Sequence, residues 1–442
     1  MEGSVMDERD VLIAGGGIGG LAAAIGLAGG GFSVHVLEKA PALGEIGAGI
    51  QLGPNAFHAF DFLGIGPQAR AMAVFVDRLR LMDALTAEEI AGIPLDEPFR
   101  KRFGNPYAVI HRGDLHGVFL RACQAHPNIR LSVNSEVVDY EQDGSSVTAI
   151  LASGGRVTGS VLIGADGLWS RIRARLVGDG APRVSGHTTY RSVIPTEQMP
   201  EDLRWNAATL WAGPHCHIVH YPLSDWKSFN LVVTSHNDAA EAVAGVPVAT
   251  DTVLAEFDHV HEKARQIIRH GVNWKAWVLC DREPVTNWVD GRVALLGDAA
   301  HPMLQYFAQG ACMAMEDAVC LTHALGVGRD DPAAALEAYR SRRVLRTARV
   351  QLQSREIGRH IYHPRGAHAE LRNAIMRAKS PADWYDTLAW IYGGDPLTQA
   401  AVAADPLTQA AVAADPVSPS AVAADPVSLS AVGATAGKVA HG

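Results

Sequence analysis

The 442-residue sequence contains few cysteines, no long apolar stretch and no excess of basic residues. Its five cysteines are scattered and form no C-x-x-C pair, which argues against a disulfide framework or a structural zinc site and fits the reducing cytoplasm. No apolar run reaches the roughly 18 residues of a membrane span, and the N-terminal residues lack the features of a signal peptide. The formal net charge of −9 provides no basic footprint for nucleic acid. We therefore expect a soluble cytoplasmic chain that binds neither membrane nor nucleic acid.

The C-terminal region is a low-complexity repeat. From Asp395 a ten-residue unit beginning with Asp-Pro occurs four times, the first two copies being identical. Proline lacks a backbone N–H and disfavours the helical conformation of the residue before it, so each Asp-Pro interrupts a helix. Residues 395–442 are predicted to form a disordered tail.

The rest of the chain reads as an α/β protein in which a sheet domain interrupts a Rossmann-like nucleotide-binding domain. The first part of the nucleotide-binding domain is assigned to residues 1–182, with an excursion to the substrate side near 75–107. Residues 183–280 mix Tyr, Trp, Thr, Val and His with turn residues, which predicts an inserted antiparallel-sheet substrate domain. Residues 281–394 are expected to complete the nucleotide-binding domain and to add C-terminal helices, including a long helix over 332–359.

A glycine-rich motif follows the first predicted strand, Val11–Ala14. Gly15 would make the tight turn out of the strand, Gly17 would let a pyrophosphate approach the backbone, and Gly20 would let the next helix pack on the sheet. Ile18 opens that helix, whose N-terminal amides and positive dipole end favour phosphate. The motif predicts an adenine dinucleotide site.

The residue at the end of the second predicted strand favours an adenosine ribose as part of the ligand. Glu38 stands there and could accept hydrogen bonds from both hydroxyls of an adenosine ribose. These residues do not distinguish FAD from NAD. The chain carries only one such motif, however, whereas a reductase holding both cofactors in Rossmann sites would need two.

Two later segments, Asp166-Gly167 and Gly297-Asp298, each follow a predicted buried strand. With the glycine motif, they occur in the order typical of the para-hydroxybenzoate hydroxylase class of single-component FAD-dependent aromatic monooxygenases. The chain resembles this family over about residues 9–394. The resemblance implies FAD as cofactor, NADH as co-substrate with NADPH not excluded, O2 and a small aromatic acid as substrates, and a possible homodimer.

The resemblance also implies roles around the flavin. Asp298 would hold the ribityl chain of FAD, Arg112 would contact the flavin, and Asp166 would lie where the pyrophosphate and the nicotinamide cofactor are handled. Gly310 and Ala311 open a predicted helix. Its N-terminal amides would face the flavin pyrimidine and stabilise the negative charge of the reduced ring.

Three segments on the substrate side, residues 213–223, 281–284 and 301–306, resemble family members that convert 3-hydroxybenzoate to gentisate. In a strand, His217 and Tyr221 project to the same face. Hydroxylation by a flavin-activated oxygen is an electrophilic attack and is faster on a phenolate, so the pocket needs a group that takes the phenolic proton. We predict His217 as this base and Tyr221 as a hydrogen-bonding partner of the substrate.

Two further residues are assigned to the same pocket. Gln305 would orient the substrate hydroxyl, and Tyr107 would cover the flavin side. No metal site is predicted, because strand geometry separates His220 from His215 and His217 and no carboxylate lies close to them in sequence.

Other functions stay open at this point. A salicylate or hydroxynicotinate hydroxylase would have the same flavin site and a different ring. A flavin-free NAD-dependent dehydrogenase would purify without colour, and a non-catalytic flavin-binding protein would show no NADH oxidation stimulated by phenolic acids.

Overall fold

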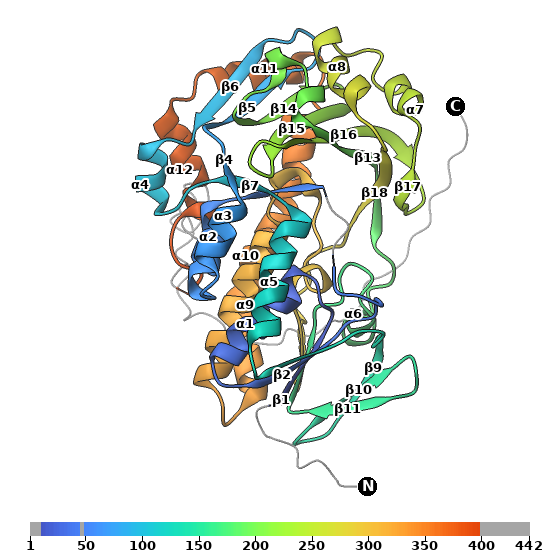
Figure 1. The fold of residues 1–442 in the computed structure, drawn as a ribbon, viewed down its shortest axis with the longest axis vertical. Coiled ribbons are helices and arrows are strands. Elements are labelled where there is room, and N and C mark those ends of the chain that lie inside the picture. Colours follow the sequence, from blue (N-terminus) through green and yellow to red (C-terminus); the bar gives the residue numbers. More distant parts are fainter. Residues whose placement is uncertain (1–9, 45–47, 398–442) are drawn as a thin grey trace, which may run out of the picture. The chain divides into compact units, whose positions relative to one another are not determined.

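A six-stranded sheet carries the nucleotide-binding part of the fold. The computed structural model describes residues 10–44 and 48–397 (Figure 1). All neighbouring strands of this sheet are parallel except the edge pair β19–β20, and the order is β19-β20-β12-β1-β2-β8. The strands are β1 (Asp10–Ala14), β2 (Ser33–Leu37), β8 (Ile129–Ser132), β12 (Val161–Gly164), β19 (Val289–Asp290) and β20 (Val293–Leu295). Helix α1 (Ile18–Gly29) makes the crossover that two adjacent parallel strands require.

An eight-stranded sheet forms the second layer. Its order is β17-β18-β13-β16-β15-β14-β5-β6, and its pairs are antiparallel except β14–β5. The strands are β5 (Arg78–Asp83), β6 (Glu89–Pro94), β13 (Arg183–Pro195), β14 (Ala207–Gly213), β15 (Cys216–Leu223), β16 (Ser228–Ala239), β17 (Ala244–Pro247) and β18 (Lys275–Asp281). The predicted α/β fold class with an added sheet is confirmed. The sheet is mixed because residues 78–94 extend it beyond the segment 183–280, and the domain limits themselves stay predictions.

Two three-stranded sheets and the remaining helices complete the described residues. The small sheets are β3-β7-β4 and β11-β10-β9. Their strands are β3 (Gly49–Leu52), β4 (Val74–Phe75), β7 (Ala108–His111), β9 (Val137–Gln142), β10 (Val147–Leu151) and β11 (Arg156–Gly159). The helices are α2 (Pro54–Phe62), α3 (Gly66–Met72), α4 (Glu97–Phe103), α5 (Arg112–Ala125), α6 (Arg171–Leu176), α7 (Thr250–Ala255), α8 (Glu262–His270), α9 (Gly310–Val327), α10 (Pro332–Ile357), α11 (Ala367–Arg377) and α12 (Pro381–Tyr392).

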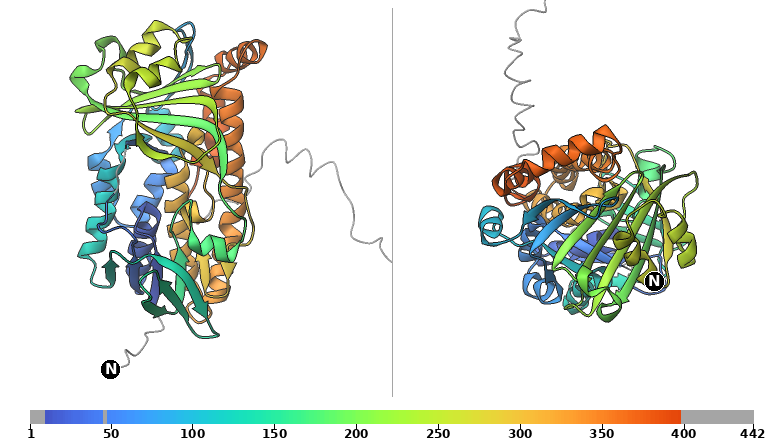
Figure 2. Two further views of the ribbon diagram at one scale, coloured as in Figure 1. Left: turned by 90° about the vertical axis from the view of Figure 1, so that its right-hand side faces the viewer. Right: turned by 90° about the horizontal axis from the view of Figure 1, so that it is seen from above.

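Helices α9 and α10 contribute to the cores of both layers, and α1 packs on the six-stranded sheet. One large apolar core packs the six-stranded sheet against α1 and α9, and two further cores lie on the two faces of the eight-stranded sheet. Figures 1 and 2 show the eight-stranded sheet at one end of residues 10–397 and β1 and β2 toward the other, with these helices running between them. The carboxyl ends of β1, β12 and β20 therefore open toward the second sheet, where ligands of such folds bind.

The predicted long helix is α10, and a π-helical turn, η5 (Gly358–Tyr362), follows it directly. None of the described helices is long and apolar enough to cross a membrane. Most of the predicted tail, residues 398–442, lies outside the described residues.

Candidate active site

A cavity of about 720 Å³ extends from the carboxyl ends of β1, β2 and β12 to the face of β15. Most of the residues singled out in the sequence line it, although they come from six separate stretches of the chain. These lining residues are Gly15, Gly17, Ile18, Glu38, Arg112, Asp166, His217, Tyr221, Asp298, Gln305, Gly310 and Ala311.

The first end of the cavity has the geometry of an adenosine site. Glu38 is half-buried, and its two carboxylate oxygens accept hydrogen bonds from the backbone N–H groups of Gly16 at 2.7 Å and Ala40 at 2.8 Å. A carboxylate oxygen can accept more than one bond, so the held carboxylate can still receive ribose hydroxyls. A Cβ on Gly15, whose φ is +110°, would lie 2.3 Å from the carbonyl oxygen of Ala165. Only glycine fits this turn.

Gly20 does not line the cavity. A Cβ at this position would lie 2.0 Å from the carbonyl oxygen of Gly15, so the missing side chain lets α1 start directly beneath the turn. This is the packing role expected of the third glycine.

Two helix N-termini point free amides at the cavity. Helix α1 starts after Gly17 and α9 starts after Gln309, and both starts line the cavity. Among the described residues, no side chain caps either helix and neither first turn contains an acid. Uncapped N-termini favour an anionic or electron-rich ligand. The pair would suit FAD, whose pyrophosphate is predicted at α1 and whose flavin pyrimidine is predicted at α9.

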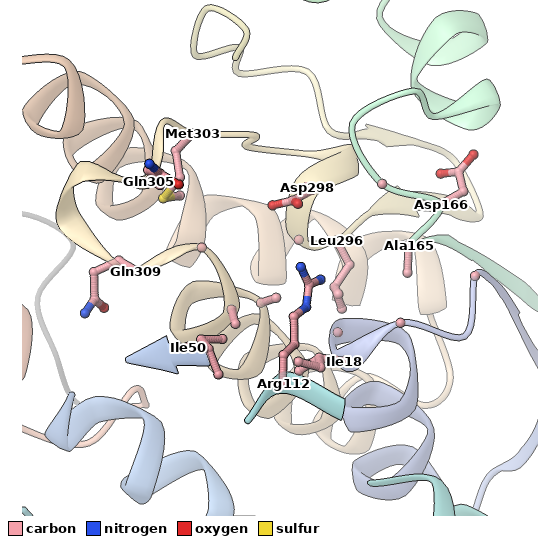
Figure 3. A pocket seen from close by; sticks show the side chains of 18 of the residues that line it. Ile18, Ile50, Arg112, Ala165, Asp166, Leu296, Asp298, Met303, Gln305 and Gln309 are labelled. Carbon is pink, nitrogen blue, oxygen red and sulfur yellow. The ribbon is translucent and has the colours of Figure 1, made fainter. Parts of the chain in front are cut away.

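Between these helix ends, Asp298 and Arg112 face the same space (Figure 3). Asp298 is exposed, although its neighbours Gly297 and Ala299 are buried. Gly297 adopts a φ of +61°, which turns the chain at the end of β20 and presents the next side chain to the cavity. The position matches the role predicted for Asp298 on the ribityl chain, a role that stays a prediction.

A network of buried ion pairs stabilises the Gly297–Asp298 turn. Asp317 accepts the backbone N–H of Gly297 at 3.0 Å, pairs with His301 at 2.6 Å and accepts Nε–H of Arg343 at 2.6 Å. Arg343 also bonds Glu316 at 2.7 Å. Burial alone would raise the pKa of both carboxyls, but attraction to the cations outweighs it and lowers each pKa to about 2.

No motif in the sequence marks this network. The available signal was the pair of adjacent acids, Glu316 and Asp317, in a helix whose other residues around them are buried and apolar. Acids are rarely buried unless they are paired.

Asp166 combines a structural contact with a place at the cavity. Its Oδ2 accepts the backbone N–H of Arg171 at 2.8 Å, which caps the short helix α6. Its Oδ1 is buried and has no hydrogen-bond partner among the described residues, and burial raises the pKa of this carboxyl. Asp166 lines the cavity, and its assignment to the pyrophosphate and the nicotinamide cofactor stays a prediction.

The other end of the cavity is the face of β15. His217, Val219 and Tyr221 all line it, as the two-residue period of a strand requires. Burial raises the pKa of Tyr221, which keeps its hydroxyl protonated as a hydrogen-bond donor. His217 is 1% exposed, and burial together with His363 lowers its pKa well below 6.5, so the ring is neutral near pH 7.

Gln305 is fixed by three neighbours. Its Nε2 donates to Thr189 at 3.0 Å and to Thr234 at 3.1 Å, and its Oε1 accepts from Arg191 at 3.0 Å. Arg191 also lines the cavity and was missed in the sequence, where nothing separates it from other strand residues. Within residues 10–44 and 48–397, no carboxylate pairs with Arg191 and its buried Nε has no hydrogen-bond acceptor.

Tyr107 lies behind the cavity wall. It is buried, and its hydroxyl donates to Oε1 of Gln51 at 2.6 Å, while Gln51 itself lines the cavity. The structure therefore brings Tyr107 to the site through Gln51, and its predicted cover of the flavin stays untested.

A parallel sheet with an uncapped helix start, a glutamate at the end of β2 and a second sheet over the cavity fit a flavin-dependent oxidoreductase. Comparison with known families agrees: residues 8–354 match the family described as FAD binding domain. The chain is 57% identical over 386 residues to 3-hydroxybenzoate 6-hydroxylase 1 of Aquipseudomonas alcaligenes, covering 87% of this chain and 98% of that protein.

A second relative and a solved structure extend the comparison. The 3-hydroxybenzoate 6-hydroxylase of Polaromonas naphthalenivorans (strain CJ2) is 50% identical over 383 residues, 87% of this chain and 95% of that protein. A salicylate hydroxylase solved as a substrate complex superposes with a TM-score of 0.75 at 27% identity, covering 90% of this chain and 98% of the other. The chain belongs to the family of FAD-dependent aromatic hydroxylases. The predictions of an FAD cofactor and of an aromatic monooxygenase are confirmed.

Proposed function

We propose that this enzyme hydroxylates 3-hydroxybenzoate para to its phenolic hydroxyl and forms gentisate, with NADH as reductant and O2 as oxidant. One observation carries the choice of substrate: the β15 end of the cavity combines a neutral imidazole, His217, with a guanidinium, Arg191, that has no carboxylate partner among the described residues. A phenolic acid supplies a proton for the first group and a negative charge for the second. The two 3-hydroxybenzoate 6-hydroxylases at 57% and 50% identity support the same substrate.

Three side chains of the cavity have different roles in the proposed reaction. The half-buried charge of Arg191 attracts the substrate carboxylate, since an unpaired cation in a low-dielectric site favours an anionic ligand. Tyr221 stays protonated and offers a hydrogen bond to a substrate oxygen. His217 takes the phenolic proton, which raises the electron density of the ring at the para carbon. Bound FAD supplies the electrons from NADH and the activation of O2 for electrophilic transfer of one oxygen atom.

The balance of the reaction follows directly. One substrate molecule, one O2, one NADH and one proton give one hydroxylated product, one water and one NAD⁺. The ring gains one oxygen atom, and the second oxygen leaves as water.

A panel of hydroxybenzoates tests the substrate. The purified yellow holoenzyme is mixed with NADH and each of 2-, 3- and 4-hydroxybenzoate, and NADH oxidation is followed with chromatography of the products. We expect stimulation and gentisate with 3-hydroxybenzoate alone. Stimulation by 2-hydroxybenzoate with formation of catechol would instead assign a salicylate hydroxylase, the activity named for the superposed structure.

A pair of histidine variants tests the base. His217→Ala should retain FAD and lose about 100-fold or more in kcat, since general base catalysis contributes roughly 10²–10⁴-fold. His220→Ala is the matched control, because His220 is buried on the same strand and does not line the cavity. Equal activity of the two variants would contradict the role of His217.

A further inference from the structure

Five histidines gather behind the β15 end of the cavity. The ring centroids are 5.0 Å apart for His217 and His363, 5.0 Å for His363 and His187, 4.4 Å for His187 and His236, and 5.6 Å for His236 and His215. Exposure increases along the series: His217 is buried, His363 and His187 are half-buried, and His215 is exposed. The group therefore connects the cavity wall to solvent.

The first two rings share a hydrogen bond. Nδ1 of His217 lies 2.8 Å from Nε2 of His363, so one hydrogen sits between two ring nitrogens. A neutral imidazole has one donor nitrogen and one acceptor nitrogen. When His217 donates from Nδ1, its Nε2 is a bare acceptor, and His363 must then carry its own hydrogen on Nδ1.

A single buried imidazole is a poor base for this reaction. Burial and the neighbouring rings lower the pKa of His217 well below 6.5 and that of His363 to about 3. Protonating either ring would place a charge where the protein disfavours one, and a phenol with a pKa of about 10 would not give up its proton easily. A path that never creates an imidazolium avoids this cost.

We propose that His217 and His363 form a two-step proton relay from the phenolic substrate to solvent. The phenolic O–H bond breaks as an N–H bond forms at Nε2 of His217. The proton on Nδ1 of His217 moves to Nε2 of His363, and the proton on Nδ1 of His363 passes to water. Both rings are neutral before and after, having exchanged tautomers. The negative charge remains on the phenolate, which His217 now stabilises by donating from Nε2.

The surroundings of the relay favour neutral rings. Tyr362 packs edge-on against His217 with centroids 4.8 Å apart, and the hydroxyl of Tyr306 is hydrogen-bonded to Nδ1 of His187. Burial raises the pKa of both tyrosines, so both stay uncharged.

Among the described residues, charged groups contact the cluster at its outer end. Asp238 lies 3.3 Å from Nε2 of His236, and Arg365 is hydrogen-bonded to His215 at 3.1 Å. In the part of the chain that the structure describes, no group of three or more His, Cys, Asp or Glu side chains is arranged to hold a metal ion.

His363 reaches His217 because of its position in the chain. It follows η5, where the backbone at the end of α10 switches to π-helical turns. Such turns are rare and occur frequently at functional sites. The segment brings both Tyr362 and His363 against β15, 146 residues away from His217 in sequence.

Substitution of His363 tests the relay, which rests on the proposed function. The holoenzyme is mixed with 3-hydroxybenzoate in weak buffer containing a pH indicator, and proton release is followed by stopped flow, together with the pH profile of kcat. Wild type should release one proton on binding. His363→Gln should slow both proton release and kcat at pH 7 by about tenfold or more. The loss should shrink as pH rises, because the substrate then arrives already ionised.

Rescue separates a relay from a structural role. In His363→Ala, imidazole added to the solution should restore part of the rate, since the vacated site is partly open to solvent. His360→Gln is the matched control: His360 is an exposed histidine of η5 that contacts His368 and Glu356, and its substitution should change nothing.

The outcomes distinguish the two claims. A wild-type enzyme that does not respond to 3-hydroxybenzoate would overturn the proposed function and the relay with it. A responsive wild type together with a His363→Gln variant of unchanged proton release and pH profile would overturn the relay alone. A loss in His363→Ala that neither imidazole nor high pH relieves would also overturn it.

Discussion

Replacing Arg343 by methionine would expose how much the Gly297–Asp298 turn depends on the charges behind it. The guanidinium is fully buried and bonds both Asp317 and Glu316. Glu316 keeps a second partner, Arg346, which bonds its two oxygens at 2.7 and 2.8 Å. Among the described residues, Asp317 would keep His301 and the Gly297 amide as partners, so the uncompensated charge falls on Asp317.

The size of the effect follows from that buried charge. Breaking a buried ion pair by removing one partner costs about 3–5 kcal/mol. At an unfolding entropy of about 2.1 cal/mol/K per residue, this lowers the melting temperature by roughly 5 °C for a body of this length. FAD retention should fall as well, because Asp317 holds the Gly297 amide at 3.0 Å and Gly297 directs Asp298 into the cavity.

Differential scanning fluorimetry and free-flavin fluorescence measure both effects. The matched control is Arg156→Met, which removes an exposed arginine paired with Glu141 on the surface and should leave the melting temperature unchanged. Adding Asp317→Asn to Arg343→Met should recover part of the stability that Arg343→Met alone loses, because the double variant leaves no unpaired charge at position 317. A single Arg343→Met variant as stable as the control would refute the reasoning.

Three further predictions concern acid stability and the flavin site. Because the folded-state pKa values of Glu316 and Asp317 are about 2, below the ordinary 4.5 and 3.8, the stability they contribute is present above about pH 4.5 and should be lost as pH falls toward 2; an acid-unfolding curve identical for wild type and Arg343→Met would contradict this. Glu38→Gln should weaken FAD binding about 10-fold or more in an apoenzyme titration, since it loses charge-assisted bonds to ribose hydroxyls; unchanged affinity would remove Glu38 from the site. Asp298→Ala should release FAD on gel filtration, and a variant that elutes fully yellow would count against its contact with the ribityl chain.

Local patterns in the sequence predicted the parts of the site that depend on neighbouring residues. The strand, the glycines and helix α1 follow one another directly, so their spacing specifies the turn. The period of two in β15 likewise puts His217 and Tyr221 on one face. The contribution of β5 and β6 to the second sheet is different, because β5 pairs with β14 from more than a hundred residues away and no short-range pattern encodes that pairing.

The residues that the sequence did not reveal act through distant contacts. Arg191 is one strand residue among many until the fold sets it beside Gln305 and leaves it without a carboxylate among the described residues. His363 follows a helical segment that carries no motif, and only the packing of this segment on β15 brings it to His217. Arg343 is a helical arginine like its neighbours, and its burial depends on how α10 lies on α9.

Oxygen transfer from 18O2 tests the central claim most directly. Wild-type enzyme is incubated with 3-hydroxybenzoate, NADH and 18O2, and the amount and mass of the product are determined by mass spectrometry. The account predicts one gentisate carrying a single 18O atom for each NADH consumed. Formation of hydrogen peroxide without labelled gentisate would mean that 3-hydroxybenzoate stimulates NADH oxidation without being hydroxylated, and it would contradict the proposed function.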